Sequence, residues 1–231
     1  LTGWYQGCKH ELEGLSDADI ERVLGAGSHH SVREGRAVLH SLPIGYALDD
    51  QRAIRDAFAR FCDERIAPQA AAIDEAKAFP RALFDELGGL GFFGMRYPEE
   101  VGGSGAGLAE FSLALAEIAR GSMSLAGAAA MQSLMGTKFL HMLGNADIVE
   151  RLFKPALKGE KVGAICMTEP NAGSDLNGIA TQAKQVDGGW LLNGQKTWIT
   201  SAPVADFFTV FAKAGDERKL TIFLVERGVE G

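Results

Sequence analysis

The spacing of apolar residues changes once along the chain, near Lys161. Before this point, apolar residues recur three and four positions apart, which is the period of an amphipathic α-helix. Beyond it, the period falls to about two residues, as in a half-buried β-strand. The pattern predicts an α+β protein in which an all-α helical domain at residues 46–161 precedes an antiparallel, β-barrel-like domain at residues 162–231.

Apolar stripes and boundary residues divide the first part into helices. The stripes are Ile54, Phe58, Phe61 and Ile66; Leu83, Phe84 and Leu87; and Leu108, Phe111, Leu115 and Ile118. After them, the pattern predicts a buried alanine-rich helix at 124–135 and two short helices at 137–143 and 146–152. Pro68, Pro80 and Gly121 stand at the expected boundaries. The glycine-rich run Gly91–Gly103 lacks the Gly-Lys-Ser/Thr ending of a phosphate-binding loop, so it predicts a connection between helices.

Six apolar or alternating runs predict the strands of the second part. They cover residues 162–165, 179–186, 190–192, 195–200, 207–212 and 220–225. Asp187-Gly188-Gly189, Asn193-Gly194 and Gly215-Asp216 are turn signals between neighbouring runs. The first run is apolar throughout, which indicates a buried strand.

Residues 1–45 show the weakest pattern of the chain. His29, His30 and His40 lie here, but no second group of ligands accompanies them, so they do not indicate a metal centre. We expect an N-terminal extension of unknown role, and no bound metal.

Composition excludes several classes of function. The net charge of the 231 residues is −7, so no basic surface is available for nucleic acid. The three cysteines, Cys8, Cys62 and Cys166, are widely spaced, which favours a reducing compartment over a disulfide framework. No apolar run reaches the ~20 residues of a membrane span, and the first residues lack the regions of a secretion signal. We expect a cytoplasmic protein, or one of the mitochondrial matrix after processing.

One stretch joins a buried strand end to a loop rich in polar donors. It reads Cys166-Met167-Thr168-Glu169-Pro170-Asn171-Ala172-Gly173-Ser174-Asp175. Such a loop offers backbone N–H groups and hydroxyls to a flat or anionic group. Further along, Trp198-Ile199-Thr200 ends another predicted strand. Each feature alone is usually only a loop or a core residue, but the two together could form the walls of a slot for a planar cofactor.

In this order and spacing, the motifs resemble those of the acyl-CoA dehydrogenase family. Those similar to its flavin-binding middle domain are Thr168-Glu169-Pro170, Gly173-Ser174-Asp175, Asn193-Gly194, Lys196 and Trp198-Ile199-Thr200. Pro98-Glu99-Glu100 followed by Gly102-Gly103 is similar to the connection between its N-terminal helices. The resemblance covers roughly residues 46–231. It implies an enzyme of fatty acid metabolism that uses FAD to introduce an α,β double bond into an acyl-CoA thioester.

The resemblance also implies roles for individual residues. Those expected at the FAD are Ile165, Cys166, Met167, Thr168, Ser174, Trp198, Ile199 and Thr200. Met167 and Thr168 are implied at the pyrimidine end of the flavin, Thr200 near its hydride-accepting nitrogen, and Trp198 along the ring. Ser174 is implied in binding the acyl-CoA. Glu169 belongs to the loop motif and is implied as structural.

The family's catalytic base is a Glu from a C-terminal helical domain, which also builds a tetramer. That helical bundle is absent from this chain, and the β domain is incomplete at its C-terminus. The resemblance therefore implies no catalytic residue within the chain and no activity for this segment alone. It further implies an electron-transferring flavoprotein as electron acceptor and a homo-oligomeric, homotetrameric, full-length protein.

Two other functions stay open. A flavin-dependent monooxygenase or oxidase of the same fold would use oxygen, although such relatives tend to lose the Thr-Glu-Pro and Gly-Ser-Asp motifs kept here. A non-catalytic subunit of an acyl-CoA dehydrogenase complex, with residues 1–45 as its interaction segment, would also lack the base.

Overall fold

The computed structural model describes residues 49–143, 145–215 and 219–229. The chain divides into two units, one ending at Phe58 and the other beginning at Ala59. The described part of the first unit is the start of helix α5 (Asp49–Phe61). The predicted extension at residues 1–45, with its three histidines, lies outside the described residues.

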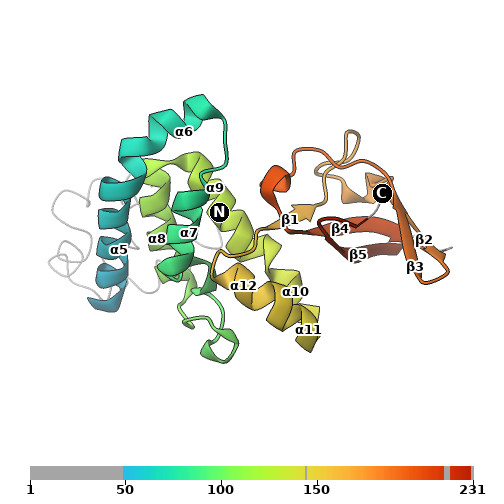
Figure 1. Cartoon of the computed structure of the whole chain (residues 1–231), viewed down its shortest axis with the longest axis horizontal. Helices are drawn as coiled ribbons and strands as arrows, with labels where there is room; N and C mark the ends of the chain where they lie inside the picture. The colour runs from blue at the N-terminus through green and yellow to red at the C-terminus, as the bar shows by residue number, and fades with distance from the viewer. Residues whose placement is uncertain (1–48, 144, 216–218, 230–231) are drawn as a thin grey trace, which may run out of the picture. The chain divides into compact units, whose positions relative to one another are not determined.

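Helices form the second unit as far as Leu157 (Figure 1). They are α6 (Ala70–Ala76), α7 (Arg81–Gly89), α8 (Leu108–Gly121), α9 (Met123–Met131), α10 (Lys138–Leu143), α11 (Ala146–Ile148) and α12 (Lys154–Leu157). π-Helical turns lie at Cys62–Ile66, Gln132–Gly136 and Val149–Phe153. The stripe predicted for residues 83–87 is buried on α7. The helix predicted through Ile66 changes to π winding after Phe61.

Helices α8 and α9 meet at a tight junction. The Ser122 hydroxyl caps α9 by accepting a hydrogen bond from the Leu125 N–H at 3.2 Å. A β-carbon on Gly121 would lie 2.8 Å from the Cys62 sulfur. Glycine therefore lets the π turn that begins at Cys62 pack closely against the end of α8. The burial predicted for the alanine-rich helix is confirmed at Ala129, which is fully buried.

The glycine-rich run between α7 and α8 folds into a compact connection. It holds two short 3₁₀ turns, Phe92–Gly94 and Glu99–Val101. The Gly103 N–H donates to the Pro98 carbonyl oxygen at 3.0 Å, and a β-carbon on Gly103 would overlap the Tyr97 carbonyl. Glycine lets the backbone of this segment approach itself closely, which agrees with the prediction that the segment is a connection between helices.

Within the described residues, five strands form one mixed sheet. They are β1 (Gly163–Cys166), β2 (Gln182–Val186), β3 (Gly189–Asn193), β4 (Phe207–Ala214) and β5 (Lys219–Glu226). β4 pairs with β1 and β2 in parallel and with β5 antiparallel, and β2 pairs with β3 antiparallel. The predicted order of a helical part followed by a sheet domain is confirmed.

The sheet differs from the prediction in its strand directions and its closure. Two pairings are parallel, because β1 and β4 are joined by a long connection that contains the β2–β3 hairpin. Side-chain alternation does not record strand direction, so the sequence pattern could not reveal this. Among the described strands, β1, β3 and β5 each pair with a single neighbour, so the sheet is open rather than a closed barrel.

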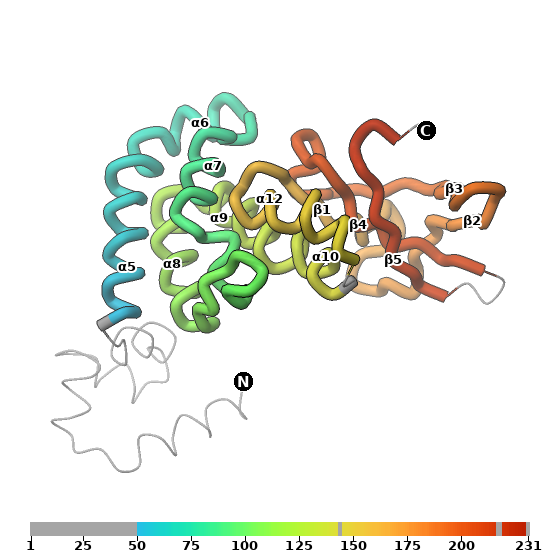
Figure 2. Tube along the Cα trace, turned by 60° about the horizontal axis from the view of Figure 1, so that its bottom comes forward, coloured from blue at the N-terminus to red at the C-terminus, as the bar shows by residue number. Residues whose placement is uncertain are grey.

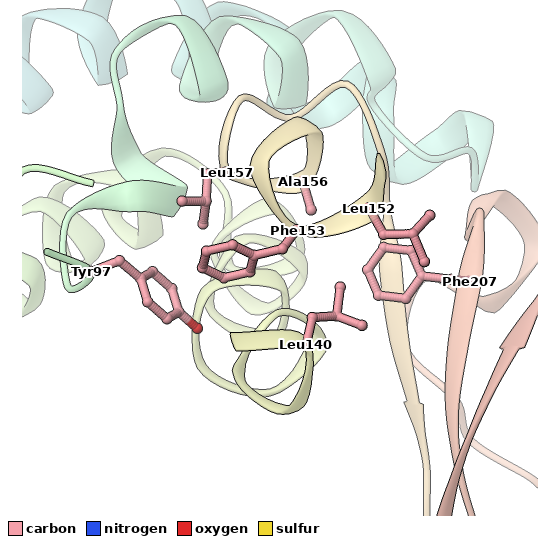
Figure 3. Packing of buried hydrophobic residues seen from close by; sticks show 7 residues of the cluster. All are labelled: Tyr97, Leu140, Leu152, Phe153, Ala156, Leu157 and Phe207. Carbon is pink, nitrogen blue, oxygen red and sulfur yellow. The ribbon is translucent and has the colours of Figure 1, made fainter. Parts of the chain in front are cut away.

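Two buried clusters join the helices of the second unit to the sheet. One comprises Tyr97, Leu140, Leu152, Phe153, Ala156, Leu157 and Phe207 (Figure 3). Phe207 is its member from β4, and Figure 3 shows it beside Leu152. The other comprises Ile165, Ala172, Ile179 and Phe211, with Met131, Met135, Phe139, Met167 and Leu176 packed against it. This second cluster holds β1 and the loop after it against the end of α9.

Candidate functional site

Two segments carry the candidate residues, and hydrogen bonds fasten one to the other. The first follows β1 and the second follows β3. The Thr197 N–H donates to the Thr168 carbonyl oxygen at 2.9 Å. The Lys196 ammonium donates to the Met167 carbonyl oxygen at 3.2 Å. The two walls expected from the sequence are therefore adjacent in the structure.

Glu169 is the centre of this junction. Its side chain is buried, and its carboxylate accepts hydrogen bonds from the Lys196 ammonium at 2.7 Å and from the Ala180 N–H at 2.7 Å. It also accepts from the N–H of Thr181 at 3.0 Å and from the Thr181 hydroxyl. The carboxylate thus joins the loop after β1 to the segment leading into β2 and to the segment after β3. This bonding is structural, as the motif implied.

Burial and hydrogen bonding act in opposite directions on the pKa of Glu169. Burial removes water from the carboxylate and by itself raises its pKa. The hydrogen bonds from Lys196, Thr181 and the backbone of Ala180 and Thr181 outweigh burial and lower the pKa to about 2. A carboxylate held in this way stays ionised at neutral pH and is a weak base, because its bound donors favour the charged form.

The segment after β3 is not the strand predicted at residues 195–200. Trp198 has a left-handed backbone, with φ at 57°, and Ser201 has φ at 65°. This geometry interrupts an extended strand and turns the Trp198 side chain outward, where it is 89% exposed. The segment presents Trp198 and Thr200 at the surface and keeps Ile199 half-buried. The strand prediction is wrong here because β-propensity depends on tertiary context, and this segment is bonded to the loop after β1 through the Thr197 N–H.

The residues at the end of β1 are less accessible. Ile165 and Cys166 are buried, so neither residue is presented to solvent. Burial raises the pKa of the Cys166 thiol to about 11, which keeps it protonated at neutral pH even though Lys196 acts in the opposite direction. Met167 and Thr168 are half-buried and follow the strand directly.

Ser174 lies further along the same loop and is exposed. The next residue, Asp175, accepts a hydrogen bond from the Asn177 N–H at 3.0 Å and begins a 3₁₀ turn. Among the described contacts, none joins Ser174 to Trp198 or Thr200. The structure therefore brings together the β1 end and the segment after β3, and it leaves Ser174 on the open side of the loop.

Gln132 is a positioning residue that the sequence did not single out. Its amide nitrogen donates to the carbonyl oxygens of Ala156 at 3.0 Å and Lys161 at 2.8 Å, and its amide oxygen accepts from the Gly163 N–H at 2.9 Å. It is buried in the π turn after α9. These bonds set the start of β1 next to α12 (Figure 2). The only signal in the sequence was one amide side chain in an otherwise small and apolar run.

A hollow of about 270 Å³ lies beside Thr200. Its lining residues are Ile73, Asp74, Lys77, Ala78, Phe79, Pro80, Ser124, Ala128, Thr200 and Ser201. It is bounded by the connection from α6 to α7, the start of α9, and the segment after β3. Thr200 thus borders open space on this side.

The donor set fits a planar aromatic group. Trp198 offers an exposed ring face, Thr200 and Ser174 offer accessible hydroxyls, and the nearby charge of Glu169 is neutralised by Lys196. Within the described residues, no group of three or more metal-binding side chains is assembled. No helix in the same residues is both long and apolar enough to cross a bilayer.

Comparison with known families assigns both parts of the chain. Residues 48–160 match the model for the N-terminal domain of acyl-CoA dehydrogenase, and residues 164–231 match the model for its middle domain. The chain belongs to the acyl-CoA dehydrogenase family. A third model, the SHS2 domain inserted in FTSA, matches residues 9–64, of which the structure describes only the end, and we draw no functional conclusion from it.

Individual relatives are similar over the same region. Benzylmalonyl-CoA dehydrogenase of Aromatoleum aromaticum is 80% identical over 183 residues, which are 79% of this chain and 48% of that protein. The structure of butyryl-CoA dehydrogenase from Megasphaera elsdenii has a TM-score of 0.75 at 30% identity, covering 80% of this chain and 50% of that one. Glutaryl-CoA dehydrogenase of Mycobacterium smegmatis in complex with FADH2 has a TM-score of 0.74 at 28% identity, covering 79% and 46%. The chain spans about half the length of these relatives.

Proposed function

We propose that the protein catalyses the FAD-dependent α,β-dehydrogenation of an acyl-CoA thioester. The observation that carries this proposal is the junction at Glu169 and Lys196, which fixes the segment of Met167 and Thr168 beside the segment of Trp198 and Thr200. A flavin enzyme needs such a fixed wall, because hydride transfer depends on the orientation of the ring toward the β-carbon. The family membership of the chain supports the same reaction.

The proposed substrate class is an arylalkyl-malonyl thioester. The support is the 80% identity to a protein named benzylmalonyl-CoA dehydrogenase, which extends over both the helical part and the sheet. More distant relatives with other acyl substrates share far less of the sequence, as the 30% identity to butyryl-CoA dehydrogenase illustrates.

The chain's own residues would hold the cofactor and orient the substrate. Bound FAD supplies the hydride acceptor. We propose that Met167 and Thr168 hold the pyrimidine end of the ring, largely through their backbone, with Ile165 and Cys166 supporting them from the buried strand. The half-buried Ile199 anchors the segment after β3, and Trp198 packs along the ring. Thr200 donates its hydroxyl near the reactive nitrogen, and Ser174 contacts the acyl-CoA.

The proton of the α-carbon needs a carboxylate base, and Glu169 does not fit that task. Its oxygens are occupied by four donors, and a pKa of about 2 makes it a poor proton acceptor. A general base works best when its pKa is near the operating pH. We infer that the base is contributed by a residue other than Glu169, which keeps the structural role described above.

We further propose an electron-transferring flavoprotein as the electron acceptor and a homo-oligomeric full-length enzyme that acts in the cytoplasm. The support is the resemblance of the motifs to the acyl-CoA dehydrogenases. Analytical ultracentrifugation of the full-length protein tests the oligomeric state, and reduction of a purified electron-transferring flavoprotein in the presence of substrate tests the acceptor.

Anaerobic mixing of the full-length, flavin-loaded protein with benzylmalonyl-CoA tests the reaction. We expect loss of the oxidised flavin absorbance and an α,β-unsaturated thioester product that has lost one hydrogen from the α-carbon and one from the β-carbon. Butyryl-CoA serves as the comparison and should bleach the flavin more slowly. Faster bleaching by butyryl-CoA would retain the reaction class and overturn the substrate class. Bound flavin that no acyl-CoA can reduce would overturn the reaction itself.

A further inference from the structure

A second, smaller pocket lies between the glycine-rich connection on one side and the π turn Gln132–Gly136 and α10 on the other. It has a volume of about 160 Å³ and is lined by Arg96, Tyr97, Pro98, Ser133, Leu134, Lys138 and His141. None of these belongs to the flavin candidates. Pockets for drug-sized or planar ligands are about 300–1,000 Å³, and a water molecule takes about 30 Å³ of liquid volume. The pocket therefore suits a ligand of a few heavy atoms.

The pocket is lined by cations and by no carboxylate. The structure gives neither Arg96 nor Lys138 an ion-pair partner among residues 49–143, 145–215 and 219–229. The Arg96 guanidinium lies 5.8 Å from the centre of the Phe111 ring, which places its charge over an aromatic face. Two side-chain cations at one small hollow create a positive potential that would attract an anion.

The inner wall contains a hydroxyl without a partner. Ser133 is 3% exposed, and its Oγ makes no hydrogen bond in the described structure. Its backbone carbonyl, in contrast, accepts a hydrogen bond from the Tyr97 hydroxyl at 3.3 Å. Buried hydroxyls are nearly always paired with protein, water or a ligand, so an unpaired one at a pocket indicates a missing partner.

The aromatic part of the wall is held in place on several sides. The Tyr97 hydroxyl bonds the Thr137 hydroxyl at 2.8 Å, and the Tyr97 ring meets the His141 ring edge-on at 5.3 Å between centres. His141 also stacks on Phe153, again at 5.3 Å. Such packing fixes the wall before a ligand arrives, which lowers the entropy lost on binding.

We propose that this pocket binds a small oxyanion, a carboxylate or a phosphate. Arg96 and Lys138 provide the charge, and the Ser133 hydroxyl donates a hydrogen bond to an anion oxygen. Guanidinium and ammonium groups form their strongest hydrogen bonds with these oxyanions, and a buried hydroxyl donor adds directional selection over chloride.

Titration calorimetry and thermal unfolding of the full-length protein test the site, with inorganic phosphate and malonate as probes and chloride at equal ionic strength as reference. We expect a saturable rise in melting temperature with phosphate, malonate or both, and the stronger of the two identifies the anion class. Lys138→Gln should weaken binding of that probe about tenfold, because it removes one charge-assisted hydrogen bond. Lys158→Gln, which removes an exposed lysine elsewhere, should leave it unchanged.

Ser133→Ala distinguishes a ligand-binding hydroxyl from a structural one. Removing an unpaired buried hydroxyl should leave the protein without added anion as stable as the wild type or more so. The same change should reduce the stabilisation by the anion. Responses to the probes no larger than to chloride, or equal responses in Lys138→Gln and Lys158→Gln, would overturn the proposal.

Discussion

Lys196 and Glu169 form a buried ion pair, with the ammonium nitrogen 2.7 Å from a carboxylate oxygen, and their side chains are 12% and 6% exposed. The pair joins the segment after β3 to the loop after β1. Loss of one partner leaves the other charge buried and unpaired. Glu169→Gln should therefore lower the free energy of unfolding by about 3–5 kcal/mol, measured by chemical denaturation of the full-length protein.

An exposed ion pair on α7 provides the matched control. Arg81 and Asp85 lie 2.7 Å apart, with side chains 43% and 51% exposed. Asp85→Asn makes the same carboxylate-to-amide change as Glu169→Gln, but in contact with water, and should cost at most about 1 kcal/mol. Equal losses of unfolding free energy in the two variants would show that burial of the Glu169–Lys196 pair does not contribute to stability.

The stability of the protein should fall in acid because of Glu169. Its folded-state pKa is about 2, below the ordinary value for Glu of about 4.3. A lowered folded pKa contributes stability that is complete above the unfolded pKa and is lost as the pH falls from about 5 toward 2. The contribution is about 3 kcal/mol. Unfolding curves of the wild type should decline over this window, and those of Glu169→Gln should be flatter.

Thr200→Val tests the proposed hydroxyl donor. Valine keeps the shape and β-branching of threonine and removes only the hydrogen bond. The exposed position predicts little effect on folding. If Thr200 donates to the flavin in its electron-rich reduced form, reduction by substrate should slow roughly tenfold while the flavin stays bound. Stopped-flow absorbance measures the rate, and a wild-type rate would contradict the proposed position of Thr200.

Trp198→Ala tests the aromatic face. Because Trp198 is 89% exposed, its truncation should change the stability of the flavin-free protein by no more than about 0.5 kcal/mol. Flavin retention should fall, since a large packed surface beside the ring is lost. Bound-flavin absorbance after gel filtration gives retention, and thermal unfolding of the flavin-free protein gives stability. Unchanged retention would show that Trp198 does not contact the ring.

The sequence pattern anticipated the elements whose apolar period is clear. The stripe of Leu83, Phe84 and Leu87 predicted α7, and its residues are buried. The alternation in β4 and β5 predicted two strands close to their observed bounds. These features depend on local burial, which a period of 3.6 or 2 residues records directly.

Other features depend on contacts between distant segments, which local periodicity does not record. The parallel pairing of β1 with β4 requires knowledge of the path between them. Trp198 has a left-handed backbone. The residue before it, Thr197, is hydrogen-bonded to Thr168 in the loop after β1. The three hydrogen bonds of Gln132 and the unpaired hydroxyl of Ser133 likewise appear only when the helices and β1 have packed.

If Trp198 packs against the flavin as proposed, its left-handed backbone sets stability and function against each other at one position. A bulky residue in the left-handed region costs about 1–2 kcal/mol, and glycine adopts it without that strain. A library randomised at position 198 and selected for heat resistance alone should therefore become enriched in glycine or asparagine. The same library selected for flavin colour should keep tryptophan. Selection for heat resistance and selection for cofactor retention would then enrich different residues at position 198 from the same library.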